Sequence, residues 1–246
     1  MKLLYSLHPA AVLPVILFTI ILSMLNINPL FSACSLAGSL ILIIAVSGVK
    51  ELLKTLKNVP IVWLSDEHAD SFHTIFLDCE ATGRLAGNYL YSKGHRKVAV
   101  IHESDYTGRG RMKGFRDVFL EQGGTPEQIC DILCTVPLHL AVKHVLDFGA
   151  TALWVTGEDM KALEVNWLIQ ELAGKRVPED ISLITFYSPE ITPFLLPEQT
   201  CIRQDFDQLA RIAMEKVCAL IEEEETDVGI LLPNEFIEGN SVSRLN

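Results

Sequence analysis

From residue 38 onward, short apolar runs alternate with amphipathic stretches of helical length. This alternation leaves few folds open, because short strands separated by helices of ~10–15 residues form βαβ units and parallel sheets. Strands are predicted at residues 39–46, 60–64, 74–77, 97–102, 129–135, 152–156 and 181–186. Helices are predicted at residues 48–56, 79–93, 109–122, 138–148, 159–173 and 205–224, and the tail 230–246 has a strand-like pattern. The sequence therefore predicts an α/β protein.

Composition narrows the range of functions. The chain has 246 residues, of which 49% are apolar, so it can bury a sizeable core. Its formal net charge of −11 does not suit a stand-alone nucleic-acid-binding protein, because contact with phosphates needs clustered Lys and Arg. The six cysteines are too sparse for a disulfide scaffold. These values exclude a disordered chain and a disulfide-rich mini-protein.

The first fifth of the chain is unusually apolar, and residues 3–49 contain no Asp, Glu, Lys or Arg. Two runs, 9–25 and 30–48, are each about long enough to span a bilayer, for which ~17–25 apolar residues are needed. The chain would turn at the NINP sequence between them, and the positive-inside rule would place Lys2 and Lys50 on the cytoplasmic side. This interpretation predicts membrane contact through residues 9–48.

Other interpretations of the same segment remain open. Lys2, the apolar residues 10–25 and the sequence Ser32-Ala33-Cys34 are similar to a secretory signal with a lipoprotein cleavage site, although the residues after Cys34 stay apolar. Residues 40–45 (LILIIA) have the length and composition of a buried parallel strand. A degenerate N-terminus is the last alternative, so the structure of residues 1–37 is left open.

The glycine-rich segment GRGRMKG at residues 108–114 follows a strand and opens a helix, as a dinucleotide-binding loop does. Its spacing is G-x-G-x-x-x-G, and the loop before it is too long for the tight first turn of that motif. Arg109 and Arg111 lie near the predicted helix start, where cations oppose the helix dipole. Such an arginine is either a solvated side chain or a ligand-binding one. In the second case its guanidinium group would offer several hydrogen-bond donors to a ligand.

The sequence shows no signature of a catalytic or metal centre. It has no G-x-S-x-G or H-E-x-x-H motif, and no pairs of Cys or His at zinc spacing. Trp154, Phe186 and Tyr187 lie at the carboxyl ends of predicted strands, where open α/β sheets bind ligands, and aromatic residues there are either core or a ligand platform. We therefore expect no enzymatic activity, no cofactor and no bound metal.

Six segments of the chain follow one another in an order known from a regulator family. They are DCEATGRLA at 78–86, GHRKVAVI at 94–101, RMKGF at 111–115, TALWVTGEDM at 151–160, VPEDISLI at 177–184 and PEQTCIRQDFDQLA at 197–210. Each resembles the corresponding segment of the LacI/GalR family of transcriptional regulators, such as G-H-R-x-I-A-x-I, R-x-x-G-F and V-P-x-D-I-S-V-x-G-F-D. The resemblance covers residues 58–246.

The resemblance implies the two-lobe fold of periplasmic binding proteins, with a parallel sheet in each α/β lobe and a small ligand in the cleft. It implies an N-lobe of residues 38–102 and 203–224, and a C-lobe of residues 103–200 and 228–246. Residues 1–37 resemble no part of the family. The family has more residues before the 59–61 strand than the chain has, so the N-lobe is expected to be incomplete or degenerate.

Carried over position by position, the resemblance assigns ligand contacts to this chain. Arg111 is implied to grip the effector, Thr107 is its polar neighbour four residues earlier, and Gln204 is a glutamine on the hinge side.

Other positions of the implied ligand site depart from the family pattern. Ser65 and Tyr187 each replace an aspartate, and Gly157 and Glu158 replace the usual Asn/Ser-Asp pair. These changes remove carboxylates that would bind sugar hydroxyls, so the identity of the effector is left open.

Two functions of different classes follow. The first is the sugar- or small-molecule-sensing domain of a LacI/GalR-type regulator, cytoplasmic and homodimeric. It would make no specific DNA contacts itself, because no helix-turn-helix is recognisable. The second is a membrane-tethered or exported solute-binding protein of the same fold.

Overall fold

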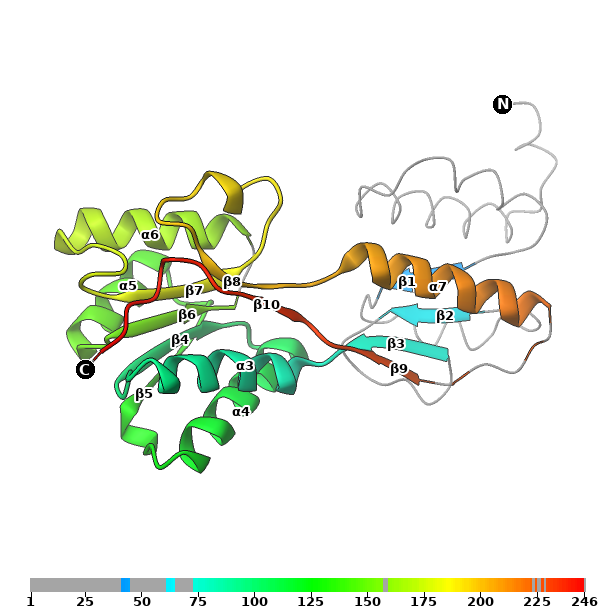
Figure 1. Ribbon diagram of the computed structural model, residues 1–246, viewed down its shortest axis with the longest axis horizontal. Coiled ribbons are helices and arrows are strands. Elements are labelled where there is room, and N and C mark those ends of the chain that lie inside the picture. The colour runs from blue at the N-terminus through cyan, green and yellow to red at the C-terminus, as the bar shows by residue number, and fades with distance from the viewer. Residues whose placement is uncertain are drawn as a thin grey trace. The chain divides into compact units, whose positions relative to one another are not determined.

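A computed structural model describes residues 41–44, 61–64, 73–156, 159–222, 224, 227 and 229–245 of the protein. The described chain forms two compact units, each with its own sheet (Figure 1). Unit 1 consists of residues 1–77 and 206–232, and unit 2 consists of residues 78–205 and 233–246. The chain therefore passes between the units three times, after Leu77, Asp205 and Leu232.

Unit 1 is built around a parallel sheet. Its described strands are β1 (Ile41–Ile44), β2 (Ile61–Leu64), β3 (His73–Leu77) and β9 (Gly229–Leu232), in the order β1-β2-β3-β9. Helix α7 (Phe206–Ile221) packs on this sheet through Leu209, Ala213 and Val217, which recur at helical spacing on one face. These residues share a core with Val62 and Ile75 of the sheet.

The apolar N-terminal segment enters unit 1 through β1. Ile41–Ile44 belong to the second apolar run and pair in parallel with β2, as the interpretation of residues 40–45 as a parallel strand predicts. The run 9–25 and the predicted helix 48–56 lie outside the described residues. Among the helices that the structure does describe, none combines the length and apolarity needed to cross a bilayer.

Unit 2 is built around a six-stranded sheet in the order β10-β8-β7-β6-β4-β5, in which only β10 is antiparallel to its neighbour. The strands are β4 (Val98–His102), β5 (Ile129–Leu133), β6 (Ala152–Val155), β7 (Ser182–Phe186), β8 (Thr200–Arg203) and β10 (Glu235–Ile237). The helices are α3 (Cys79–Ser92), α4 (Tyr106–Glu121), α5 (Leu138–Phe148) and α6 (Asp159–Ala173), with short 3-10 turns at Pro126–Gln128 and Thr192–Phe194.

Helices cover both faces of the six-stranded sheet (Figure 1). α5 and α6 pack on one face, where Val145 and Ile169 join a core with Leu153 of β6. α3 and α4 pack on the other face, where Phe115 stacks on Trp154 with ring centroids 5.6 Å apart. Side chains alternate along β6 between the two cores, as expected for a strand buried on both faces.

The lobe boundary expected at residue 102 is wrong. Residues 78–102 belong to unit 2, because α3 packs on α4, and β4 pairs with β5 and β6 of the second sheet. Likewise, β9 pairs with β3, so residues 229–232 belong to unit 1 and not to the expected C-lobe segment 228–246. Sheet membership depends on strand pairing, which the local sequence pattern does not reveal.

Helix α4 begins three residues earlier than the predicted start at residue 109. The carboxylate of Asp105 accepts a hydrogen bond of 2.8 Å from the backbone N–H of Gly108 and so caps the helix at Tyr106. Arg111 therefore lies in the second turn and not in the first. Its backbone is fixed against α3, because a Cβ on Gly83 would collide with the carbonyl oxygen of Arg111.

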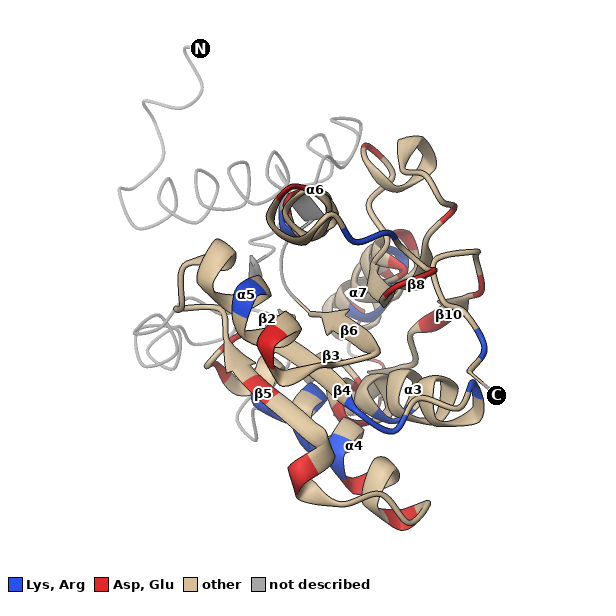
Figure 2. Cartoon of the chain, turned by 90° about the vertical axis from the view of Figure 1, so that its left-hand side faces the viewer, with Lys and Arg blue, Asp and Glu red and all other residues tan. Residues whose placement is uncertain are grey.

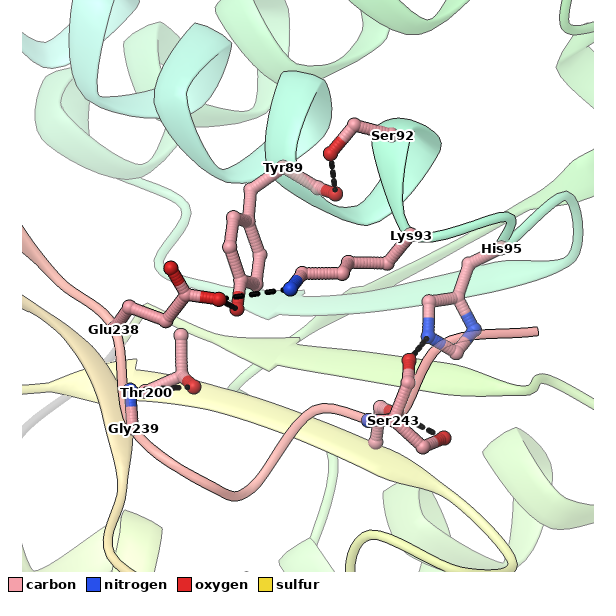
Figure 3. Close-up of polar contacts among 9 residues, drawn as sticks. Tyr89, Ser92, Lys93, His95, Thr200, Glu238, Gly239 and Ser243 are labelled. Atoms are coloured by element: carbon pink, nitrogen blue, oxygen red, sulfur yellow. Dashed lines mark hydrogen bonds and ion pairs between the residues drawn. The ribbon is translucent and has the colours of Figure 1, made fainter.

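The C-terminal segment forms hydrogen bonds with residues at the amino end of the sheet of unit 2 (Figure 3). His95 Nε2 lies 3.1 Å from the Ser243 carbonyl oxygen, and its Nδ1 lies 2.9 Å from Thr151 Oγ1. The Glu238 carboxylate accepts hydrogen bonds from the Tyr89 hydroxyl at 2.8 Å and from Lys93 Nζ at 2.7 Å.

Candidate functional site

The carboxyl ends of β4, β6 and β7 meet at one edge of the six-stranded sheet, because these strands are parallel. A polar residue follows each of them: Glu103 after β4, Thr156 after β6 and Tyr187 after β7. The first turns of α4 begin three residues after Glu103. Ligands of open α/β sheets bind at this edge. We call Glu103, Arg111, Thr156, Lys161 and Phe186 the carboxyl-edge site.

Arg111 is the most deeply buried cation of this site, with 7% of the residue exposed. Its Nη1 donates a hydrogen bond of 3.0 Å to the carbonyl oxygen of Thr156, and its guanidinium carbon lies 4.4 Å from the centroid of the Phe186 ring. Its Nε is buried and finds no hydrogen-bond partner among the described residues. Most buried N–H groups have a partner, so this unpaired donor is an exception.

Glu103 adds a carboxylate to the site. The hydroxyl of Thr156 donates a hydrogen bond of 2.8 Å to Glu103 Oε2, and Lys161 Nζ lies 4.0 Å from Oε1. The side chains of Lys161 and Glu103 are each about a quarter exposed, at 27% and 23%. Thr156 thus contacts Arg111 through its backbone and Glu103 through its side chain.

His102 lies behind the carboxyl-edge site, with only 4% of the residue exposed. Its Nε2 lies 2.7 Å from Asp131 Oδ1, and its Nδ1 lies 2.8 Å from the Glu103 carbonyl oxygen. Both partners are hydrogen-bond acceptors, so both ring nitrogens donate and the imidazole is the charged form. Arg116 Nη2 donates a hydrogen bond of 2.9 Å to the other oxygen of Asp131.

The protonation of this pair follows from its surroundings. Burial lowers the pKa of His102, but the hydrogen bond and charge of Asp131, together with the Glu103 carbonyl, outweigh burial and raise the pKa above its ordinary value. The hydrogen bond from His102, followed by the charges of His102 and Arg116, lowers the pKa of Asp131. Both shifts favour the charged forms of the pair.

The structure describes three further sequence-predicted residues at the carboxyl ends of these strands or on α4. Thr107 lies on α4 one turn before Arg111, on the same face, and is half-buried. Tyr187 directly follows Phe186 and is half-buried, with its ring centroid 6.0 Å from the guanidinium carbon of Arg203. Gln204 follows β8, the neighbour of β7.

The remaining predicted residues, Ser65, Gly157 and Glu158, lie outside the described residues. The ligand-binding role of each predicted residue stays a prediction.

Three members of the site, Glu103, Thr156 and Lys161, were not identified from the sequence. Glu103 directly follows a predicted strand, so the rule that α/β sheets bind ligands beyond their carboxyl ends could have found it. Lys161 gives no comparable signal, because an exposed-looking lysine near the start of a helix is usually solvated.

Unit 1 contains a separate open hollow of about 870 Å³ beside α7, lined by residues that include His73, Glu215, Lys216 and Asp227. Lys216 is buried, and its Nζ already donates a hydrogen bond to the Asp227 carbonyl oxygen. Elsewhere in the described parts of both units, no three His, Cys, Asp or Glu side chains stand together as metal ligands would. The carboxyl-edge site is therefore the better candidate for ligand binding.

Comparisons with known proteins agree with this architecture. Residues 88–242 match the family described as periplasmic binding protein-like domain. The HTH-type transcriptional repressor PurR of Serratia proteamaculans is 29% identical over 209 residues, which cover 78% of this chain and 59% of that protein. Catabolite control protein A of Streptococcus mutans is 25% identical, with 63% of this chain and 48% of that protein covered. The chain thus spans about half the length of these curated relatives.

A solved structure shows the same fold. A LacI family transcriptional regulator from Enterococcus faecium, determined with bound ribose, superposes with a TM-score of 0.72 at 22% identity, covering 82% of this chain and 77% of that one. The family match extends over more than half of the chain, and the two parallel-sheet units are joined by three chain crossings. The chain therefore belongs to the family of periplasmic binding protein-like domains.

Proposed function

We propose that the chain is the effector-binding part of a transcriptional regulator, and that it senses a small polyhydroxylated ligand, with a sugar as the first candidate. The observation that carries this proposal is the buried Arg111 side chain, which has a spare donor at Nε beside the Phe186 ring. A guanidinium fork of this kind suits paired oxygen acceptors such as vicinal hydroxyls. The ribose bound to the Enterococcus faecium regulator supports a sugar as candidate.

Around Arg111, the ligand would contact residues contributed by several loops. Thr107 is on the same face of α4, and Tyr187 and Gln204 follow the neighbouring strands β7 and β8. We include Ser65 and the Gly157-Glu158 pair in the proposed site because of their sequence positions. Binding and not catalysis is the proposed activity, which agrees with relatives that are named repressors.

DNA recognition would come from a different part of a complete regulator. The chain has a net charge of −11. Figure 2 shows Lys and Arg mixed with Asp and Glu over unit 2, as in the ion pair of 2.5 Å between Lys143 and Asp147 on α5. Such mixing does not provide the clustered positive charge that phosphate contacts need. As a transcriptional regulator, the protein would work in the cytoplasm.

We also propose that the regulator is a homodimer. Phe194 and Leu196, in one loop of unit 2, are 80% and 85% exposed, which is unusual for large apolar side chains that stand so close in sequence. A sedimentation measurement should give twice the mass of the chain, and a monomer at all concentrations would contradict this part of the proposal.

Replacement of Arg111 tests the proposed function. A thermal-shift screen of the full chain with pentoses, hexoses, disaccharides and nucleobases should identify a ligand, because a ligand that binds only the folded state raises its stability. A hydrogen bond to a charged group is worth about 1.5–3 kcal/mol, so Arg111→Ala should weaken binding of that ligand roughly 10- to 150-fold.

Arg109→Ala is the matched control. Arg109 lies on the same helix, but it is exposed and donates to the Ser104 carbonyl, so its loss should leave ligand affinity unchanged. Equal losses in both variants, or a full response of Arg111→Ala to the ligand, would move the ligand site elsewhere. A wild-type protein that responds to no compound of the screen would contradict the proposed function itself.

A further inference from the structure

The two carboxylate oxygens of Glu103 differ in their contacts to the described residues, because Oε2 accepts a hydrogen bond and Oε1 does not. Oε2 accepts a hydrogen bond of 2.8 Å from the Thr156 hydroxyl, which fixes the direction of the side chain. Oε1 has no hydrogen bond within the described part of the chain, since Lys161 Nζ stands 4.0 Å away. The side chain is 23% exposed and so is partly open to solvent.

Thr156 brings this carboxylate close to Arg111. Its hydroxyl contacts Glu103, and its carbonyl oxygen accepts from Arg111 Nη1 at 3.0 Å. One residue thus holds an acceptor-only carboxylate and a donor-only guanidinium, each with unused hydrogen-bonding capacity. A hydroxyl group both donates and accepts, so adjacent hydroxyls on one small molecule can satisfy both side chains.

The charges of the site set a preference between ligands. Arg111 and Lys161 are cations, and the imidazolium of His102 lies behind them with Asp131 as its partner. Among the described residues of the carboxyl-edge site, Glu103 carries the negative charge, and it would repel a carboxylate brought against Arg111. Without Glu103, the same cations would favour an anionic ligand.

We propose that Glu103 is a specificity-determining residue that makes the carboxyl-edge site select an uncharged polyhydroxylated ligand over the corresponding sugar acid. This inference rests on the proposed function. The family resemblance leads one to expect aspartates at positions 65 and 187, where this chain has Ser65 and Tyr187. Glu103 would supply a carboxylate to the site in their place. The chain obtains that group from the loop after β4.

Calorimetric titration of the full chain with matched sugar pairs tests the proposal. The probes are glucose and glucuronate, and galactose and galacturonate, at pH 7. Wild type should bind the neutral member of at least one pair roughly 10-fold or more tightly than its acid. Glu103→Gln should lose roughly 10-fold for the neutral sugar and gain affinity for the acid, so that the preference disappears or reverses. Glu103→Asp keeps the charge and should still discriminate against the acid.

Glu121→Gln provides the control, because this glutamate is 56% exposed at the end of α4 and pairs with Arg84. It should retain the wild-type preference. A thermal melt of each variant verifies folding. If wild type binds sugars but Glu103→Gln keeps the wild-type ratio, or if wild type prefers the acids, the role of Glu103 is refuted while the proposed function stands. If wild type binds none of the sugars in these titrations or in the wider screen, the proposed function fails and this inference fails with it.

Discussion

The two edges of the six-stranded sheet each hold a buried histidine, and the two histidines differ in their partners. At the amino edge, His95 lies between a hydroxyl, Thr151 Oγ1 at 2.9 Å, and a carbonyl, Ser243 O at 3.1 Å. At the carboxyl edge, His102 lies between a carboxylate of Asp131 at 2.7 Å and the Glu103 carbonyl at 2.8 Å. The residue type is the same, but only the second pair of partners includes a carboxylate.

This difference sets the charge of each histidine. Burial lowers the pKa of His95, and the opposing effect of the Ser243 carbonyl is smaller, so the neutral ring is favoured at this edge. His102 donates through both nitrogens and is charged. A neutral, fully paired cluster holds the fold together at one edge. The other edge concentrates charges and a spare Arg111 donor, which is what a ligand site requires.

The largest effect on stability is expected from breaking the amino edge. His95→Ala leaves the Ser243 carbonyl without its histidine donor, whereas the Thr151 hydroxyl keeps the Lys97 carbonyl as a partner, and an unsatisfied buried group costs about 1–3 kcal/mol. We expect urea unfolding to show a loss of that size and ligand affinity to stay at the wild-type value. His144→Ala, at an exposed position of α5, is the control and should change the free energy of unfolding by less than about 0.5 kcal/mol.

Arg111→Ala should differ from His95→Ala in ligand affinity, which it should lose, although it also removes the donor to the buried Thr156 carbonyl and should cost about 1–3 kcal/mol of stability. If His95→Ala weakens ligand binding as strongly as Arg111→Ala does, the two edges are not functionally separate.

The two histidines should also differ in how their contributions to the free energy of unfolding depend on pH, and this effect is smaller. A histidine of the unfolded chain titrates near pH 6.5. The folded-state pKa of His102 is raised, so its stabilising contribution is complete below about pH 6.5 and is lost as the pH rises through the folded-state value. The folded-state pKa of His95 is lowered, so its contribution is present above about pH 6.5 and is lost as the pH falls through the folded-state value.

Urea unfolding of His102→Gln and His95→Gln tests this contrast. The free energy of unfolding of each variant is compared with that of wild type from pH 5 to 9, in steps of about one pH unit. The deficit of His102→Gln should shrink toward high pH, and the deficit of His95→Gln should shrink toward low pH. Asp131→Asn should reproduce the His102→Gln profile, because it removes the carboxylate that keeps His102 charged. Parallel profiles for the two histidine variants would contradict the assigned protonation states.

Much of the sheet was predictable because its strands are buried on both faces and appear as continuous apolar runs, as in β4 and β7. The short strand β8 is not predicted, since four residues are too few to show a period, and β10 lies within the tail 230–246, for which only a strand-like pattern is predicted. The boundary between the units was misplaced at residue 102, because the assignment of β4 depends on its pairing with β5 and β6.

The site was predictable to a lesser extent. Arg111 could be singled out by its resemblance to a family motif and by its unfavourable place near a helix start. The role of Glu103 could not, because its partner Thr156 lies 53 residues away in sequence and only the sheet brings them together. The protonation of His102 likewise depends on Asp131, which comes from a different strand.

The smallest loss of stability is expected from substitutions at the exposed part of the amino edge. Glu238 accepts from Tyr89 and Lys93, which gives the amino edge a visible ion-pair cluster beside the buried His95 contacts (Figure 3). The Glu238 side chain is 60% exposed, and exposed ion pairs contribute little because water and salt screen them. Glu238→Gln should therefore lower the urea midpoint by much less than His95→Ala does, and the difference from wild type should vanish in ~1 M salt. A loss as large as that of His95→Ala, unaffected by salt, would mean that the amino edge depends on its surface ion pair and not on the buried neutral histidine.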